Sequence, residues 1–163
     1  MKIHIALAFL ISLLFSTRSF SQLHLGIGFI GGFPSGEFDK ESNIGPGIYL
    51  EGKVGLKDKI YGGLGVSAIY FSGDNSGNTG SIDPTVMIPV LITLDYNFWD
   101  TKWTPYAGVG VGPYIIDSEI SKETKIGVNP RLGIYLGSLN LGVGYHIVND
   151  FNFFSFQIGY LKR

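Results

Sequence analysis

Apolar and polar residues alternate with a period of two through most of the chain. The clearest stretch is 86–98, where seven alternate positions, from Val86 to Phe98, are all apolar. The opposite face of this stretch carries Met87, Pro89, Leu91, Thr93, Asp95 and Asn97. Successive side chains of a β-strand point to opposite faces, so this pattern predicts a strand with one continuous apolar face.

The same alternation recurs between clusters of Gly, Pro, Asn, Asp and Ser, which are typical of turns. It predicts eight strands, at 22–33, 44–57, 60–72, 85–98, 104–116, 126–137, 139–148 and 152–161. Thirteen residues of strand extend for ~40 Å, whereas strands of globular domains are usually about 5–6 residues long. Strands of this length are typical of barrels that cross a bilayer at a tilt.

The predicted connections alternate between long and short, except that the last one, 148–151, is short where a long one is expected. The long ones are 34–43, 73–84 and 117–125, and the short ones centre on 57–59, 99–103 and 137–138. Long outer loops and short periplasmic turns are the rule in outer-membrane barrels. The sequence therefore predicts an all-β, eight-stranded, antiparallel up-and-down transmembrane β-barrel with both termini on the periplasmic side.

The first 21 residues have the features of an export signal. Lys2 precedes an almost unbroken apolar run from Ile3 to Phe15, and the small residues Ser19 and Ser21 follow. We expect a signal peptide over 1–21, cleavage before Gln22, and an outer-membrane barrel domain over 22–163. A membrane anchor is the alternative, but the apolar run is shorter than the ~20 residues that a spanning helix needs.

Composition agrees with an apolar exterior. Only 15% of the residues are charged, against about 25% in soluble domains, and 24 of the 163 residues are glycine. The net charge of −1 gives no electrostatic basis for binding nucleic acid. The chain has no cysteine, which excludes disulfides and thiolate metal sites.

The polar faces of the predicted strands carry a balanced set of charges. Glu51, Lys53, Asp95 and Arg131 all lie opposite the aliphatic face and would point into the barrel. Because a buried charge must be paired, we expect an internal salt-bridge network. Side chains that would complete its hydrogen bonds are Tyr49, Asn129, Tyr135, His146 and Gln157. Side chains just fill an eight-stranded barrel, so we expect no open pore.

Aromatic residues gather near the predicted strand ends. Trp99, Trp103, Tyr61 and Tyr106 lie beside short turns, and Tyr70 and Tyr114 lie near the opposite ends. Two belts of aromatic residues mark the two membrane–water interfaces of such barrels. We therefore expect these six side chains at the membrane interfaces.

One predicted hairpin resembles a known family. The strand Ile88-Pro-Val-Leu-Ile-Thr-Leu-Asp-Tyr-Asn-Phe98 is followed, after a short turn, by Thr104-Pro-Tyr-Ala-Gly-Val-Gly-Val-Gly112. This hairpin is similar to the central hairpin of OmpA-like and opacity-type outer-membrane β-barrel domains. The departure is at the C-terminus, where Leu161, Lys162 and Arg163 follow Tyr160 instead of a terminal aromatic residue.

The resemblance implies a place in the outer membrane of a Gram-negative-type bacterium. Its implied partners are outer-membrane lipid and lipopolysaccharide, the barrel-insertion machinery and periplasmic chaperones. An extracellular ligand would be contacted through loops 34–43, 73–84 and 117–125. The implied role is structural, adhesive or loop-mediated binding.

Other classes of protein fit the sequence less well. A secreted lipocalin-like barrel that binds a small apolar ligand also has eight strands and a signal peptide, but it needs a charged exterior. Small outer-membrane enzymes that modify lipid place a serine close after a histidine on an outward face, whereas Ile147-Val148-Asn149 follows the inward-facing His146. We expect no cofactor site, because Gly26-Ile-Gly-Phe-Ile-Gly31 lacks the helix that a dinucleotide site requires. We also expect no catalytic or metal site, because the chain has neither a G-x-S-x-G nor an H-E-x-x-H motif.

Overall fold

A computed structural model describes residues 23–36, 43–72, 84–99, 101–118 and 122–162 of the 163-residue chain. The signal peptide expected at 1–21 lies outside these residues, as do 37–42 and 73–83 of the two long loops. The residues that the structure describes contain no helical segment with the length and hydrophobicity needed to span a bilayer.

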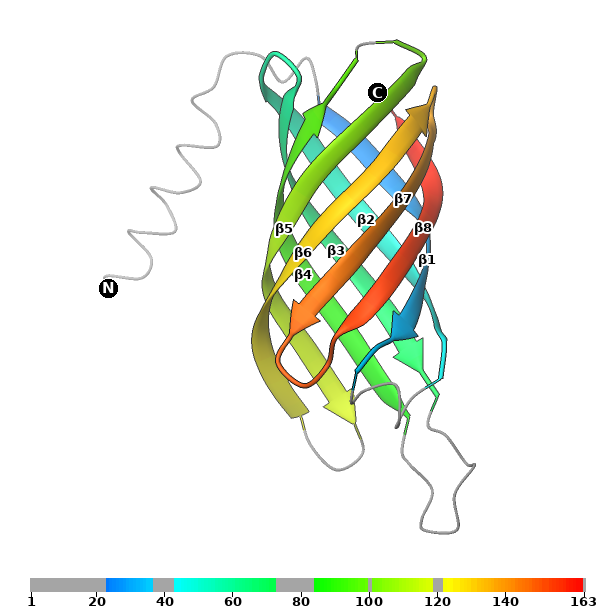
Figure 1. Cartoon of the computed structure of the whole chain (residues 1–163), viewed down its shortest axis with the longest axis vertical. Helices are drawn as coiled ribbons and strands as arrows, with labels where there is room; N and C mark the ends of the chain where they lie inside the picture. Colours follow the sequence, from blue (N-terminus) through cyan, green and yellow to red (C-terminus); the bar gives the residue numbers. More distant parts are fainter. Residues whose placement is uncertain (1–22, 37–42, 73–83, 100, 119–121, 163) are drawn as a thin grey trace, which may run out of the picture.

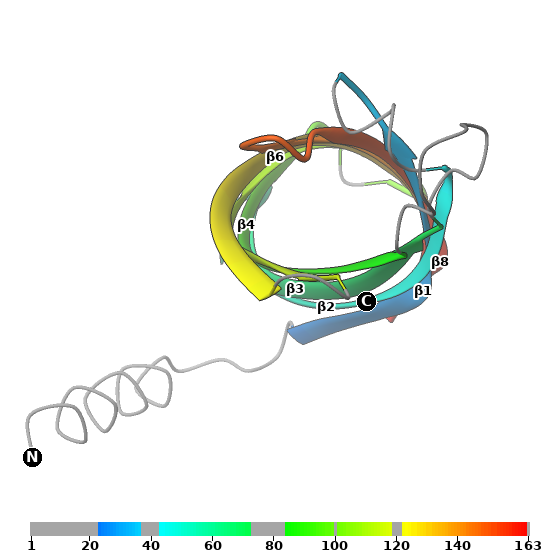
Figure 2. The same ribbon diagram turned by 90° about the horizontal axis from the view of Figure 1, so that it is seen from below.

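The described chain forms a closed antiparallel barrel. Its strands are β1 (Leu23–Pro34), β2 (Gly45–Lys57), β3 (Ile60–Phe71), β4 (Thr85–Asn97), β5 (Trp103–Ser118), β6 (Lys122–Leu136), β7 (Leu139–Val148) and β8 (Phe153–Lys162). Each strand pairs with the next, and β8 pairs with β1 to close the ring (Figures 1 and 2). The predicted fold, an eight-stranded antiparallel up-and-down barrel, is confirmed.

The predicted strand boundaries hold to within about two residues, except between β5 and β6. The loop expected at 117–125 is wrong, because Asp117 and Ser118 belong to β5, and β6 begins at Lys122. A 3.2 Å ion pair joins Lys122 and Asp117 across this extension. Backbone pairing does not depend on side-chain polarity, so the ladder continues past the point where the apolar alternation stops.

The β2–β3, β4–β5 and β6–β7 turns and the C-terminus lie at one end of the barrel (Figure 1). The other connections, which include the short β7–β8 turn, lie at the opposite end. We call these two ends the short-turn end and the long-loop end. The β6–β7 turn is closed by Gly137, whose φ of 64° is readily adopted only by glycine.

The two faces of each strand differ sharply in character. Outward side chains are mainly large and apolar, and they include Ile27, Phe29, Ile48, Leu64, Ile92, Leu94, Ile126, Leu132, Val143 and Phe156. Inward positions carry the buried polar and aromatic residues. A slip of one residue would exchange these faces, so the alternation also fixes the register of each strand.

Candidate functional site

Four charged side chains meet inside the barrel in its short-turn half. Lys53 on β2 lies 3.2 Å from Glu51 on the same strand and 3.0 Å from Asp95 on β4. Arg131 on β6 binds both oxygens of Asp95, at 2.8 and 2.5 Å, and lies 3.6 Å from Glu51. Each acid therefore faces both bases, and the cluster carries no net formal charge.

A shell of hydrogen bonds surrounds this charged cluster. Asn140 donates to Glu51 and to the Tyr49 hydroxyl, both at 3.3 Å, and accepts from Tyr106 at 3.2 Å. Gln157 donates to the Tyr106 hydroxyl at 3.2 Å. The Lys53 ammonium donates to the Tyr135 hydroxyl, and the Tyr135 ring stacks on that of Tyr106. Buried charges are tolerated when their remaining donors and acceptors are satisfied in this way.

Gly108 allows Asp95 on β4 and Arg131 on β6 to make contact across β5. Gly108 on β5 pairs with Asp95 on one side and with Arg131 on the other. A Cβ atom at this position would overlap an Asp95 carboxylate oxygen and lie 2.7 Å from the Leu94 carbonyl. The missing side chain provides the space through which Arg131 reaches Asp95.

His146 belongs to a second polar group in the lumen. Its Nδ1 lies 2.8 Å from the Tyr114 hydroxyl, and its Nε2 lies 3.0 Å from the Ser155 hydroxyl. The structure thus brings seven of the predicted inward residues together in one cluster and its shell, and places His146 in a separate hydrogen-bonded group. The seven are Glu51, Lys53, Asp95, Arg131, Tyr49, Tyr135 and Gln157.

Four residues of these groups were not expected in them from the sequence: Tyr106, Tyr114, Asn140 and Ser155. A signal was present, because Asn140 shares the inward face of its strand with His146, and Ser155 shares that of Gln157. The alternation placed these side chains on the inner face but did not say which strands would bring them into contact.

Three tyrosines expected at the membrane interfaces point into the barrel instead. Tyr106 and Tyr114 are only 1% and 0% exposed. Tyr61 lines a small luminal cavity with Lys53 and packs on His24, with ring centroids 5.6 Å apart. These tyrosines were expected at the interface because they lie near strand ends. Along each strand, however, they occupy the alternate positions whose side chains face the lumen.

The other three aromatic residues lie on the exterior near strand ends. Trp99 and Trp103 flank the β4–β5 turn at the short-turn end and are 59% and 67% exposed. Tyr70 is exposed near the long-loop end of β3.

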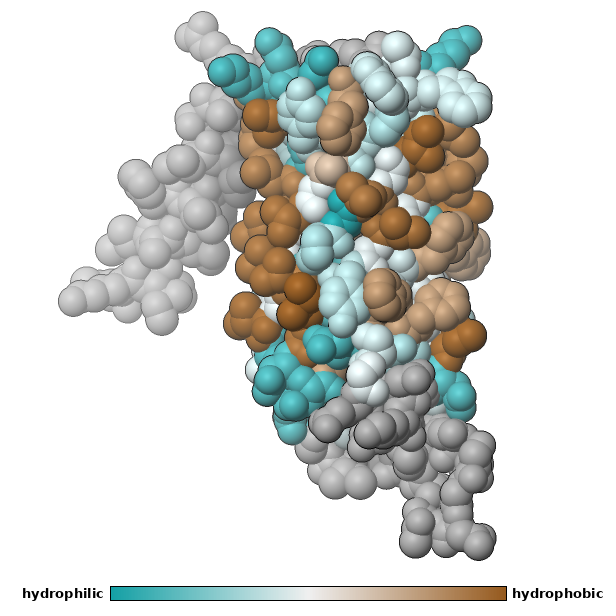
Figure 3. Space-filling view, viewed as in Figure 1, coloured by the Kyte–Doolittle hydropathy of each residue, from teal (hydrophilic) through white to brown (hydrophobic). Residues whose placement is uncertain are grey.

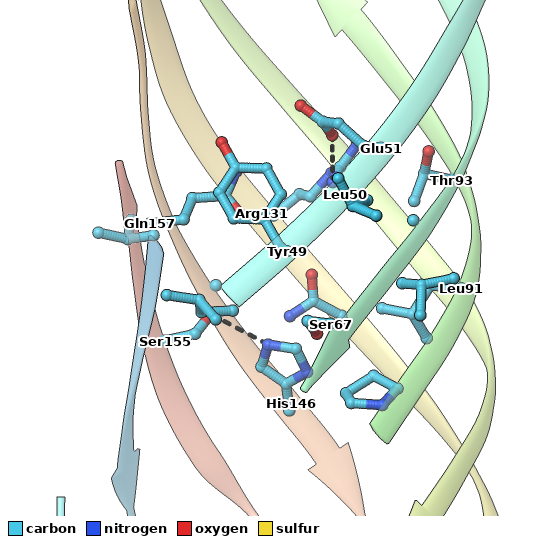
Figure 4. A pocket seen from close by; sticks show the side chains of 17 residues that line it. Tyr49, Leu50, Glu51, Ser67, Leu91, Thr93, Arg131, His146, Ser155 and Gln157 are labelled. Atoms are coloured by element: carbon cyan, nitrogen blue, oxygen red, sulfur yellow. Dashed lines mark hydrogen bonds and ion pairs between the residues drawn. The ribbon is translucent and has the colours of Figure 1, made fainter. Parts of the chain in front are cut away.

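A small cavity lies in the middle of the lumen, between the charged cluster and His146 (Figure 4). Its volume is about 40 Å³, and its lining includes Gly65, Thr93, Asn129, Arg131 and Ser155. The buried amide nitrogen of Asn129 has no hydrogen-bond partner among the described residues. The cavity is of a size for water molecules and far below the ~300–1,000 Å³ that small-molecule sites occupy.

The described residues contain no group of three His, Asp or Glu side chains placed to hold a metal ion. The lumen is thus filled by paired charges, hydrogen-bonded side chains and apolar residues.

No protein-family model and no curated protein matches the sequence. Solved structures do match the fold. The outer-membrane protein OprG from Pseudomonas aeruginosa aligns at a TM-score of 0.66 and 14% identity, over 87% of this chain and 96% of that one. Neisserial surface protein A aligns at 0.56 and 12%, over 85% and 95%.

The attachment invasion locus protein Ail of Yersinia pestis aligns at a TM-score of 0.51 and 14% identity, over 86% of this chain and 98% of that one. These structural neighbours are, by name, an outer-membrane protein, a surface protein and an attachment protein. At such low identity the likeness shows a shared eight-stranded barrel fold.

Proposed function

We propose that this chain is an integral outer-membrane β-barrel with a lumen closed by side chains and a structural, adhesive or loop-mediated binding role. The observation that carries the proposal is the apolar exterior. Large aliphatic and aromatic side chains cover the barrel wall, and polar residues gather at its two ends (Figure 3). A surface of this extent would be exposed to water in a soluble monomer, whereas lipid covers it in a membrane.

The distribution of polarity argues against the main alternative, a secreted lipocalin-like barrel. Such a barrel would need a charged outer wall and an apolar cavity large enough for its ligand. Here Glu51, Lys53, Asp95 and Arg131 lie inside, and Ile92 and Leu94 lie outside. The central cavity of about 40 Å³ is also too small for a ligand of that class.

An outer-membrane enzyme is also disfavoured. His146 does have a serine partner, Ser155, but both side chains are buried in the lumen between Tyr114 and the cavity. A lipid substrate would have to reach this pair through a packed barrel. We infer that the pair fills the lumen and catalyses no reaction.

Membership of the OmpA-like and opacity-type family is part of this proposal, on the evidence of the hairpin from Ile88 to Gly112. The proposed partners are outer-membrane lipid and lipopolysaccharide, the barrel-insertion machinery and periplasmic chaperones. Ligand contacts would come from connections 34–43 and 73–84 and from the tip of the β5–β6 hairpin within 117–125. The attachment protein among the structural neighbours makes a loop-mediated role reasonable.

Membrane fractionation of a bacterial host that expresses the full chain tests the location. We expect the protein in the outer-membrane fraction, and we expect an unboiled gel sample to migrate differently from a boiled one. Recovery as a soluble periplasmic or secreted monomer would overturn the proposal. Deletion of 73–83, scored for binding to cells or lipopolysaccharide, would then test the loops.

A matched pair of lysine substitutions tests which face meets lipid. Ile92 lies midway along β4 and Leu56 lies next to the β2–β3 turn, and both are exposed. In a bilayer, Ile92→Lys should lower the free energy of unfolding by ~2–4 kcal/mol and Leu56→Lys by ~0–1 kcal/mol, because the cost depends on depth. Equal small effects of both substitutions would indicate a water-exposed wall.

A further inference from the structure

The two ends of the barrel differ in charge. The short-turn end carries four exposed lysines, Lys57, Lys59, Lys102 and Lys162, and among the described residues its one exposed acid is Asp58. At the long-loop end, the described residues include two lysines against three acids: Lys122, Lys125, Asp117, Glu123 and Asp150.

The lysines at the two ends also differ in their partners. At the long-loop end, Lys122 pairs with Asp117 at 3.2 Å, and Lys125 pairs with Glu123 and Asp150 at 3.3 and 3.2 Å. None of the four lysines at the short-turn end forms an ion pair with a carboxylate in the part of the chain that the structure describes. The Lys59 ammonium donates to the Phe98 carbonyl at 3.2 Å, a neutral acceptor that leaves its positive charge uncompensated.

Backbone hydrogen bonds link the short turns and the last strand to their neighbours at this end. The amide of Asn97 donates to the Lys59 carbonyl, and the amide of Gly137 donates to the Lys102 carbonyl, both at 2.8 Å. The amide of Leu161, next to Lys162, donates to the Ser138 carbonyl at 2.7 Å. Lys57, Lys59, Lys102 and Lys162 thus all lie at the short-turn end of the barrel, and we call this set of lysines the basic rim.

Two exposed indoles, Trp99 and Trp103, lie at the same end of the barrel and flank the turn that holds Lys102. Exposed tryptophan is typical of the headgroup level of a membrane, and a lysine just beyond that level can bury its stem and keep its ammonium among the headgroups. The basic rim therefore has the composition of a surface that contacts lipid phosphates.

We propose that the basic rim binds anionic phospholipid headgroups of the leaflet that surrounds the short-turn end. This inference rests on the proposed membrane location and adds the lipid class. The attraction between a lysine near the surface and an anionic leaflet corresponds to about a fivefold change in affinity. The long-loop end would show no such preference, because its described lysines are already paired with acids.

The two tryptophans give a direct measurement, because they are the only ones in the chain and both lie at the basic rim. The full-length mature barrel is refolded into vesicles of phosphatidylcholine and phosphatidylglycerol, with bromine on the acyl chains of one lipid or the other. Bromine quenches tryptophan fluorescence on contact. We expect brominated phosphatidylglycerol to quench more strongly at equal mole fraction, with about a fivefold higher association constant.

Lysine variants test whether these side chains cause the preference for phosphatidylglycerol. The quadruple variant K57Q/K59Q/K102Q/K162Q should quench nearly equally with the two brominated lipids. The arginine version, K57R/K59R/K102R/K162R, should keep the preference, and so should K122Q/K125Q at the opposite end. Raising the salt concentration to 1 M should reduce the preference, because it shortens the Debye length to about 3 Å.

The results can overturn the preference for anionic lipid without overturning the proposed membrane location. Equal quenching of the native barrel by both lipids, or an undiminished preference in the quadruple glutamine variant, would overturn this inference alone. Binding of soluble polyphosphate through the same lysines, without any lipid preference, would also overturn it. Absence of quenching by both lipids would overturn the membrane proposal as well.

Discussion

The two halves of the lumen are filled by different means. In the short-turn half, Glu51, Lys53, Asp95 and Arg131 form an ion cluster inside a shell of hydrogen bonds. In the long-loop half, apolar side chains pack together with no charged residue among them: Ile30, Ile69, Phe71, Met87, Ile116, Val148 and Phe153. One narrow barrel thus contains an ionic interior in one half and, in the other, an uncharged interior of apolar side chains beside the Tyr114–His146–Ser155 group.

This difference shows what each kind of filling depends on. The ion cluster depends on the presence of every partner, because a charge that loses its counter-ion remains buried and unpaired. The apolar half depends on volume, because the loss of a large side chain leaves a cavity that the rigid wall cannot close. Substitutions in the two halves should therefore destabilise the barrel for different reasons and independently of one another.

Removal of Arg131 is expected to have the largest effect. Arg131→Ala should lower the free energy of unfolding by ~4 kcal/mol, because the carboxylate of Asp95 loses its bidentate partner. Denaturant unfolding in lipid vesicles, followed by tryptophan fluorescence, measures the change. Lys125→Ala, which breaks exposed ion pairs at the long-loop end, is the control and should cost ~1 kcal/mol or less. Equal effects of the two substitutions would mean that burial of the cluster has no energetic consequence.

Truncation of Phe153 is the matching change in the apolar half. Its ring stacks on His146, with centroids 4.0 Å apart, and meets the edge of Phe71 at 5.5 Å. Phe153→Ala should lower the free energy of unfolding by ~3 kcal/mol, chiefly through the cavity that it leaves. The same unfolding assay measures this value.

The double variant R131A/F153A tests whether the two halves are energetically independent. Independent sites give additive effects to within ~0.5 kcal/mol. We expect additivity, because no described hydrogen bond or ion pair joins Phe153 to the charged cluster. A coupling energy above ~1 kcal/mol would show that the halves act as one unit.

Two glycines on the same face of β3 give the smallest and most specific test. A Cβ atom at Gly63 would lie 2.7 Å from the Gly52 carbonyl and 2.8 Å from the Thr93 hydroxyl, whereas at Gly65 the nearest atom is 3.9 Å away. Gly63→Ala should destabilise the barrel by ~1–2 kcal/mol through overpacking. Gly65→Ala should stabilise it by ~0.5 kcal/mol, because the methyl group enters the central cavity and the unfolded chain loses freedom. Changes of the same sign at both positions would contradict the existence of this cavity.

The alternation of apolar and polar residues predicted those features of the fold that depend on residues close together in the sequence. The alternation from Val86 to Phe98 set both the length of one strand and its apolar face. The inward direction of Glu51, Lys53, Asp95 and Arg131 followed from the same rule, because parity along a strand decides which wall a side chain faces. The same rule would have placed Tyr106 inside, but the glycines at 108, 110 and 112 hid the alternation of that strand.

The sequence alone was enough to predict the number of strands, the outward face of the strands with clear alternation, and the four charges that must be neutralised inside. Only the tertiary structure decided which inward residues meet, because that depends on how each strand is offset from its neighbours when the sheet closes. The offset across β5 placed Gly108 between Asp95 and Arg131. The offset between β7 and β8 placed Ser155 beside His146. Closure of the barrel also left the amide of Asn129, on β6, facing a cavity. These contacts join positions far apart along the chain, and no periodicity within a single strand encodes them.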